Sequence, residues 1–177
     1  MKYREYTRNQ GLIRNLNKVR TDSYPNLDDL DRRVIVELQK DCRAPLVNLA
    51  RKLGTSKSTV HYRISRLEKE GVITGYYAHI SPLRLRKEYA AIVLTQARVG
   101  IGLRGRLRIG RQIAAVPGVW SVYAVFGEYD FIFLVRADSR QDLAEKVNAV
   151  TAMRGVERTN SQIVEIAVKE DPRVEIE

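Results

Sequence analysis

A run of hydrogen-bonding and cationic side chains follows a turn-like Gly54-Thr55 pair, in a segment whose apolar residues recur at helical spacing. Ser56 is a natural N-cap, and Val60, Ile64 and Leu67 would form the buried face of the helix that it starts. The opposite face carries groups that bind DNA base edges and phosphates. These predicted DNA-binding residues are Lys57, Ser58, Thr59, His61, Tyr62, Arg63 and Arg66.

The residues before this helix complete a helix-turn-helix pattern. Leu46, Leu49 and Leu53 form the apolar face of a preceding helix, Ala50 is small enough for close packing, and Gly54 suits the left-handed turn. In this motif the N-terminal part of the second helix meets the bases. Base contacts are therefore expected from Lys57, Ser58, His61 and Tyr62, and phosphate contacts from Arg63 and Arg66.

A plainer interpretation of the same pattern is a three-helix packing module with a solvated polar face. Under that interpretation Arg63 pairs with a nearby Glu, and Thr59 is half buried. The basic excess of the segment favours DNA binding.

A second segment with the chemistry of a binding site is Gly127-Glu128-Tyr129-Asp130. Gly127 allows the backbone to turn and leaves amides accessible, and Asp130 offers a carboxylate to an ammonium group. A free amide and a carboxylate together can hold both ends of a zwitterion such as an amino acid. The alternative is an ordinary hairpin with a turn glycine and a solvated acid.

The segment Gly100–Gly105 reads G-x-G-x-x-G and resembles a dinucleotide-binding fingerprint. That fold requires parallel strands joined by crossovers. Here only four residues separate the strands expected at 119–126 and 131–137, which predicts an antiparallel pair. A glycine-rich connection to the following helix is the favoured interpretation.

The pattern of the whole chain predicts an α+β protein. Three short helices are expected between residues 27 and 71, and residues 72–80 form either a wing or a connecting strand. Strands at 90–99, 119–126, 131–137 and 156–168, with helices at 104–116 and 140–153, give the ferredoxin-like β-α-β-β-α-β order. The expected divisions are a basic arm (1–26), a winged-helix-like helix-turn-helix domain (27–80), a linker (81–89), a second domain (90–171) and a tail (172–177).

Composition narrows the classes of protein. The 177 residues carry a net charge of +10, of which +4 lies in residues 1–26, +5 in 27–86 and only +1 in 87–177. This asymmetry places polyanion binding in the first half of the chain. One cysteine and two histidines provide no metal cluster, and no nucleophile–base pair indicates an enzyme or a cofactor. The apolar stretches are too short for a membrane span, and a cytoplasmic protein is expected.

Three segments resemble the Lrp/AsnC (feast/famine) family of prokaryotic transcription regulators. They are Leu27-Asp-Asp-Leu-Asp-Arg-Arg-Val-Ile, the run from Arg63 to Tyr76, and the Gly127–Asp130 hairpin within the β-α-β-β-α-β module. The resemblance spans residues 27–171. It implies a DNA-binding domain followed by a domain that senses a ligand and forms dimers through its sheet, with dimers often assembling into octamers.

The resemblance also implies an amino-acid effector, held near the hairpin at a subunit interface. Carried over by position, the effector-binding residues are Gly127, Tyr129, Asp130, Thr159 and Ser161, and family members often have threonine where Ser161 stands. The first functional hypothesis is therefore a sequence-specific regulator of transcription modulated by an amino acid. The alternative is an architectural DNA-coating protein whose second domain serves only in assembly.

Overall fold

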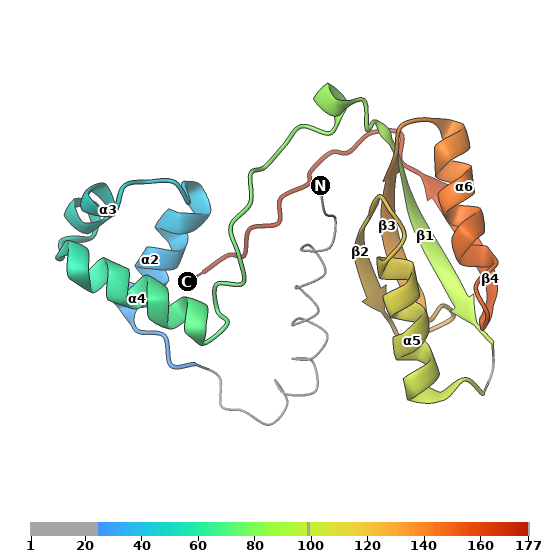
Figure 1. Ribbon diagram of the computed structural model, residues 1–177, viewed down its shortest axis with the longest axis horizontal. Helices are drawn as coiled ribbons and strands as arrows, with labels where there is room; N and C mark the ends of the chain where they lie inside the picture. Colours follow the sequence, from blue (N-terminus) through green and yellow to red (C-terminus); the bar gives the residue numbers. More distant parts are fainter. Residues whose placement is uncertain (1–24, 99, 177) are drawn as a thin grey trace, which may run out of the picture. The chain divides into compact units, whose positions relative to one another are not determined.

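The structure is a computed structural model that describes residues 25–98 and 100–176. The chain forms two compact units (Figure 1): one contains the residues up to Ala78 together with Pro172–Glu177, and the other contains His79–Asp171. Most of the basic arm expected at 1–26 lies outside the described residues.

The N-terminal unit contains three helices, α2 (Asp29–Lys40), α3 (Leu46–Leu53) and α4 (Lys57–Lys69). Their apolar faces meet in one core, which contains Val34, Leu49, Ala50, Leu53, Val60 and Leu67. Gly54 ends α3 in the left-handed conformation, and the Ser56 hydroxyl accepts a hydrogen bond from the Thr59 amide at 3.1 Å. The predicted helix-turn-helix and its cap are confirmed.

The segment after α4 contains no β-strand between residues 72 and 80. The amides of Val72 and Ile73 instead donate to the Leu67 carbonyl, at 2.9 and 3.1 Å, and so close the end of α4. The chain then continues as a coil (Figure 1). The strand considered for this segment does not form, and its first two amides instead cap the end of α4.

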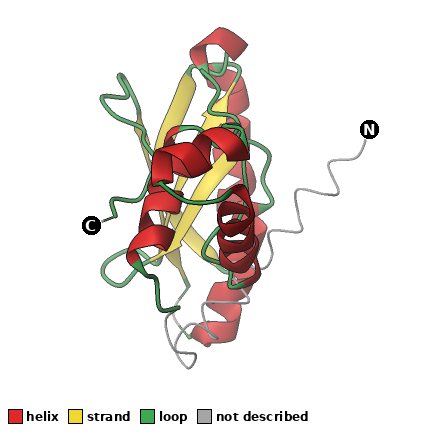
Figure 2. Ribbon diagram, turned by 90° about the vertical axis from the view of Figure 1, so that its left-hand side faces the viewer, coloured by secondary structure: helices red, strands yellow, loops and turns green. Residues whose placement is uncertain are grey.

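The second unit consists of β1 (Tyr89–Ala97), α5 (Gly102–Ala114), β2 (Val119–Ala124), β3 (Phe131–Ala137), α6 (Arg140–Thr151) and β4 (Val156–Ile163). The strands form one antiparallel sheet in the order β2-β3-β1-β4 (yellow in Figure 2). This confirms the ferredoxin-like prediction, and an all-antiparallel sheet is incompatible with a doubly wound dinucleotide-binding domain.

The last strand is shorter than predicted, since it ends at Ile163 rather than at Val168. Ile163 pairs with Ala91, and the Val164 amide donates to the Ala90 carbonyl at 2.9 Å. Because β1 begins at Tyr89, the residues beyond this point have no neighbouring strand to pair with. The β-branched residues there suggested a strand that the sheet cannot accommodate.

The sheet has one covered face and one open face. Alternate residues of β1 and β3, including Val93 and Phe133, pack against both helices: the core also contains Ile109 and Ile113 of α5 and Leu143 and Val150 of α6. The other face presents Ile92, Trp120 and Tyr123, which are 39%, 50% and 56% exposed. Both helices therefore cover the same face, and the opposite face carries exposed apolar side chains.

Residues 172–176, expected as a tail, lie against α2 of the N-terminal unit. The Gln39 side-chain amide donates to the Val174 carbonyl at 2.8 Å, and the Val174 amide donates back to Gln39 Oε1 at 2.7 Å.

Within the part of the chain that the structure describes, no helix has both the length and the apolar character needed to cross a membrane.

Candidate DNA interface and ligand site

The first turns of α4 present the residues predicted to contact base edges. Lys57, Ser58, His61 and Tyr62 are all exposed, and Tyr62 is 63% exposed. The Ser58 and Thr59 hydroxyls each lie 2.8 Å from Ser56 Oγ, so both take part in the N-terminal cap. Thr59 is half buried, as considered above. Lys57, His61 and Tyr62 are the side chains that extend most freely from this end of the helix.

The two arginines predicted to contact phosphate are held by carboxylates of α2. Arg63 Nη1 lies 2.5 Å from Asp28 Oδ2 and 3.1 Å from Asp31 Oδ1, and Arg66 Nη2 pairs with Asp31 Oδ2. Asp31 is fully buried, whereas the arginine side chains keep 21% and 27% of their surface exposed. This network fixes α4 against α2, so both arginines position the recognition helix.

Asp28 connects this network to the start of α2. It is the N-cap residue, and it exchanges two hydrogen bonds with Asp31: the Asp31 amide donates to Asp28 Oδ1 at 2.9 Å, and the Asp28 amide donates to Asp31 Oδ2 at 3.1 Å. The bond from the Asp31 amide and the one from Arg63 lower the pKa of Asp28. The hydrogen bond to Asp28 in turn raises the pKa of Arg63. The pair therefore remains ionised at neutral pH.

The Gly127–Asp130 hairpin joins β2 to β3 at the end of the sheet where β1 finishes. Gly127 has φ +140°, a region that favours glycine, and a Cβ added there would meet no atom within 4 Å. Asp130 is anchored on two sides: Oδ2 accepts from the Ala97 amide at 2.8 Å, and Oδ1 lies 3.3 Å from Arg106 Nε of α5. The charge of the Asp130 carboxylate is thus already paired within the chain.

Arg158 of β4 connects the hairpin to the neighbouring strands. Its guanidinium donates to Glu128 Oε1 at 2.9 Å and to Gln96 Oε1 at 2.6 Å, and it lies 5.8 Å from the centre of the Tyr129 ring. The sequence analysis missed both Arg106 and Arg158. Their link to the hairpin depends on the helix position and the strand register, and a pattern of single residues contains neither.

The two β4 residues carried over from the family lie on the face that the helices cover. Thr159 pairs with Thr95, whose carbonyl accepts from the Asp130 amide at 2.9 Å, so Thr159 is one strand away from the hairpin. The Thr159 hydroxyl lies 2.9 Å from Thr151 Oγ1 of α6. Ser161, two residues further along β4, lines a groove of about 1220 Å³ beside α6. Thr95 Oγ1 is buried and has no hydrogen-bond partner among the described residues.

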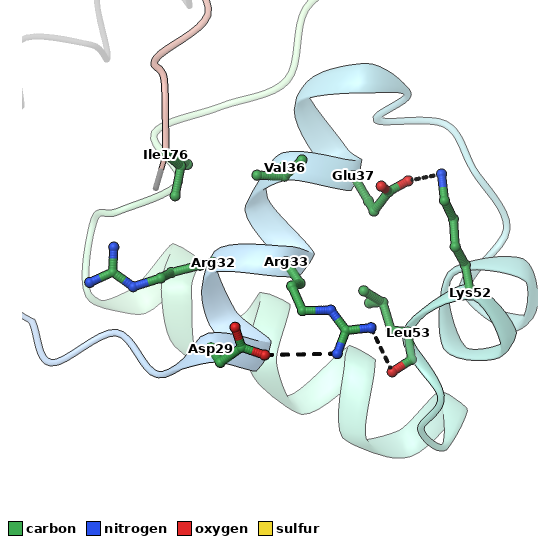
Figure 3. Close-up of a pocket in the computed structure, with 8 residues that line it drawn as sticks. All are labelled: Asp29, Arg32, Arg33, Val36, Glu37, Lys52, Leu53 and Ile176. Atoms are coloured by element: carbon green, nitrogen blue, oxygen red, sulfur yellow. Dashed lines mark hydrogen bonds and ion pairs between the residues drawn. The ribbon is translucent and has the colours of Figure 1, made fainter.

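A smaller hollow of about 360 Å³ lies in the N-terminal unit between α2 and α3, with Ile176 at its edge (Figure 3). Four of its charged side chains are paired: Arg33 contacts Asp29 at 3.8 Å and donates to the Leu53 carbonyl at 3.3 Å, and Lys52 pairs with Glu37. It contains none of the predicted site residues.

Among the described residues, no three His, Cys, Asp or Glu side chains are grouped so that they could hold a metal ion.

The helix-turn-helix with its exposed polar face, followed by a ferredoxin-like domain, defines a two-domain DNA-binding regulator. Comparison with known families gives the same result. The winged helix-turn-helix DNA-binding family matches residues 27–74, and the Lrp/AsnC ligand-binding domain matches residues 96–174. The chain belongs to the Lrp/AsnC family of transcriptional regulators, which are not enzymes.

Relatives and solved structures agree over nearly the whole of their own length. An HTH-type transcriptional regulator of Pyrococcus abyssi is 38% identical over 151 residues, which cover 84% of this chain and 99% of the relative. The feast or famine regulatory protein of M. tuberculosis complexed with L-methionine is 32% identical with a TM-score of 0.76, covering 84% and 99%. A transcriptional regulator–L-Met complex from Neisseria meningitidis, 22% identical with a TM-score of 0.76 over 85% and 97%, shares the fold.

Proposed function

We propose that this regulator recognises a specific DNA sequence through the N-terminal half of α4 and changes its DNA binding when an amino acid occupies the second domain. The observation that carries the DNA half is the exposure of Lys57, His61 and Tyr62 at the end of the helix that enters the major groove in this motif. None of the three side chains forms an ion pair or a hydrogen bond within the described residues. Their donors are therefore available to base edges.

Arg63 and Arg66 have a divided role in this proposal. Each is partly exposed, so each can approach a phosphate, but Asp28 and Asp31 neutralise much of their charge. A fully available cation changes the slope of log K against log salt by about 0.9 per phosphate contact. We expect Arg63→Gln to change the slope by less than Lys69→Gln does, because Lys69 is exposed in the last turn of α4 and has no ion pair within the described residues. Equal changes would show that the carboxylates do not restrain the arginine.

The amino-acid effector is proposed at the hairpin, with Gly127, Tyr129 and Asp130 as its predicted contacts and Thr159 and Ser161 on β4. The support is the match to the Lrp/AsnC ligand-binding domain and the two similar structures that contain methionine. The Gly127 backbone is open enough for a ligand to approach. Because Arg106 already pairs with Asp130, the effector ammonium would share this carboxylate rather than meet an unpaired one.

The homodimer implied by the resemblance is proposed to form through the open face of the sheet, and octamers by assembly of such dimers. Ile92, Trp120 and Tyr123 expose apolar surface there, which a second copy would remove from water. Two copies related by a two-fold axis would read a pseudo-palindromic site with half-sites about one helical turn apart.

The test combines footprinting with ligand screening. The purified protein is footprinted on DNA upstream of its own gene and on random DNA, with and without each of the twenty amino acids, and its melting temperature is measured with the same set. Protection of a defined site that changes with one amino acid is the expected result. Equal binding to all DNA, with no amino acid raising the melting temperature, would refute the regulator and favour the architectural alternative. The steep salt dependence of such binding would come from phosphates alone.

A further inference from the structure

The net charge of only +1 over residues 87–177 conceals a strongly basic segment. No Asp or Glu occurs between Glu88 and Glu128, and this stretch contains five arginines. From Glu128 to the end of the chain the net charge is −4. Four of these arginines lie on α5, and the fifth, Arg98, directly follows β1.

Three of these arginines form a stripe along α5. Arg104, Arg108 and Arg111 are spaced by four and three residues, which places them on one face of the helix, and all three are exposed. None has an ion pair within residues 25–98 and 100–176. Arg106, by contrast, points to the hairpin and pairs with Asp130. We call Arg104, Arg108 and Arg111 the arginine stripe.

The stability of the helix does not explain the arginine stripe. Arg104 lies in the first turn of α5, where the helix dipole favours an acidic residue, and that turn contains none. Arg104 and Arg108 are like charges at positions i and i+4, which destabilises a helix. The stripe therefore opposes the helix that presents it, and a polyanionic partner would remove the conflict.

We propose that the arginine stripe binds the phosphate backbone of the DNA, as a second contact beyond α4. Arg104 and Arg111 are about 10 Å apart along the helix axis. One strand of B-DNA carries about three phosphates over that length. Because α4 already holds the duplex, the stripe acts at a high effective concentration, so a weak, sequence-independent contact is sufficient. The contact adds affinity and leaves base preference unchanged.

The test measures the salt dependence of binding to a random-sequence duplex for the full-length protein. Arg104→Gln/Arg108→Gln removes two charges from the stripe, and Arg140→Gln/Lys169→Gln removes two exposed charges elsewhere in the same unit. The slope of log K against log salt should fall by about 1.8 in the stripe variant, at about 0.9 per contact, and little in the control. Arg104→Lys/Arg108→Lys should keep the slope, because phosphate contacts need only the charge.

Three results would overturn the proposal: an unchanged slope, an equal fall in the control, or a changed oligomeric size of the stripe variant. The last would make the stripe a contact between proteins. All variants replace exposed side chains, and an unchanged melting temperature verifies folding. The proposed sequence-specific function is tested separately. If the wild type shows no preference for its own upstream DNA, the proposed sequence-specific function is refuted. The slope on random DNA still tests whether the arginine stripe contacts phosphates.

Discussion

Replacement of Asp31 by Asn tests whether the buried network orients the recognition helix. Asp31 accepts from Arg63, Arg66 and the Asp28 amide, and its side chain is fully buried. Asparagine has nearly the same shape but offers one acceptor oxygen in place of two. The substitution therefore places an amide donor against a guanidinium donor and leaves a cation without its counter-charge.

The expected cost follows from burial. Removal of one partner from a fully buried ion pair costs about 3–5 kcal/mol. Here the two arginines remain about a quarter exposed, and the amide keeps one hydrogen bond, so the expected loss is about 2–3 kcal/mol. Native domains are stable by about 5–15 kcal/mol in total. The expected loss is thus a large part of the total free energy of unfolding of a three-helix unit.

The two units can be followed separately in urea. Trp120 is the only tryptophan and lies in β2, so its fluorescence reports on the second unit, whereas far-UV circular dichroism includes α2, α3 and α4. With m about 1 kcal/mol/M for a small unit, Asp31→Asn should lower the midpoint of the helical transition by about 2–3 M and leave the tryptophan transition in place.

The matched control is Asp29→Asn, two positions earlier on α2. Asp29 loses the same charge, but it is 86% exposed and pairs with Arg33 only at 3.8 Å, so less than about 0.5 kcal/mol is expected. If Asp31→Asn moves the midpoint no further than Asp29→Asn, the network does not hold α4, and the reasoning is wrong.

Three further predictions concern the two sites. Alanine at Lys57 or His61 should reduce discrimination against a mutated operator by about 5–150-fold, corresponding to about 1–3 kcal/mol per base contact. Lys69 is exposed in the last turn of α4, away from the base-reading end, so Lys69→Ala should weaken binding to all sequences alike, and competition binding checks both outcomes. Because the pKa of Asp28 is lowered in the folded state, its stabilisation is complete above the unfolded pKa near 4 and is lost as pH falls through the folded value. Asp28→Asn should therefore flatten the acid limb of the unfolding curve of the N-terminal unit, and an unchanged limb would contradict this. Asp130→Asn keeps the bond from the Ala97 amide but weakens the pair with Arg106, so the second unit should lose about 1 kcal/mol, or about 5 °C in melting temperature, with Glu128→Gln as the exposed control.

The parts that the sequence predicted correctly are those governed by local rules. Ser56, Gly54 and the spacing of Val60, Ile64 and Leu67 define α4, and the short connection expected before Phe131 requires antiparallel strands. β3 spans Phe131–Ala137, the bounds that the sequence predicted. Each of these features depends on neighbours within a few positions, so a single sequence contains it.

The parts that the sequence missed depend on distant partners. Asp31 lies 32 and 35 residues before Arg63 and Arg66, and its position in a first helical turn has an adequate local explanation, so nothing in the pattern indicates burial. The end of β4 depends on where β1 begins. The pairing of Arg106 with Asp130 depends on how α5 sits on the sheet. Packing decides all three, and one sequence does not specify the packing.

The charge of this chain shows how such partners change a functional argument. The +5 of residues 27–86 includes Arg63 and Arg66, whose charge is largely taken up by Asp28 and Asp31, so the sum overstates the cations that the helix-turn-helix offers to DNA. The +1 of residues 87–177 cancels the arginine stripe against acidic residues elsewhere in that part of the chain, so this sum understates the cations that α5 exposes. What attracts a polyanion is the unpaired charge on a surface. By that measure α5 is a stronger candidate for phosphate contact than the second half of α4, although the net charges of the two halves suggest the reverse.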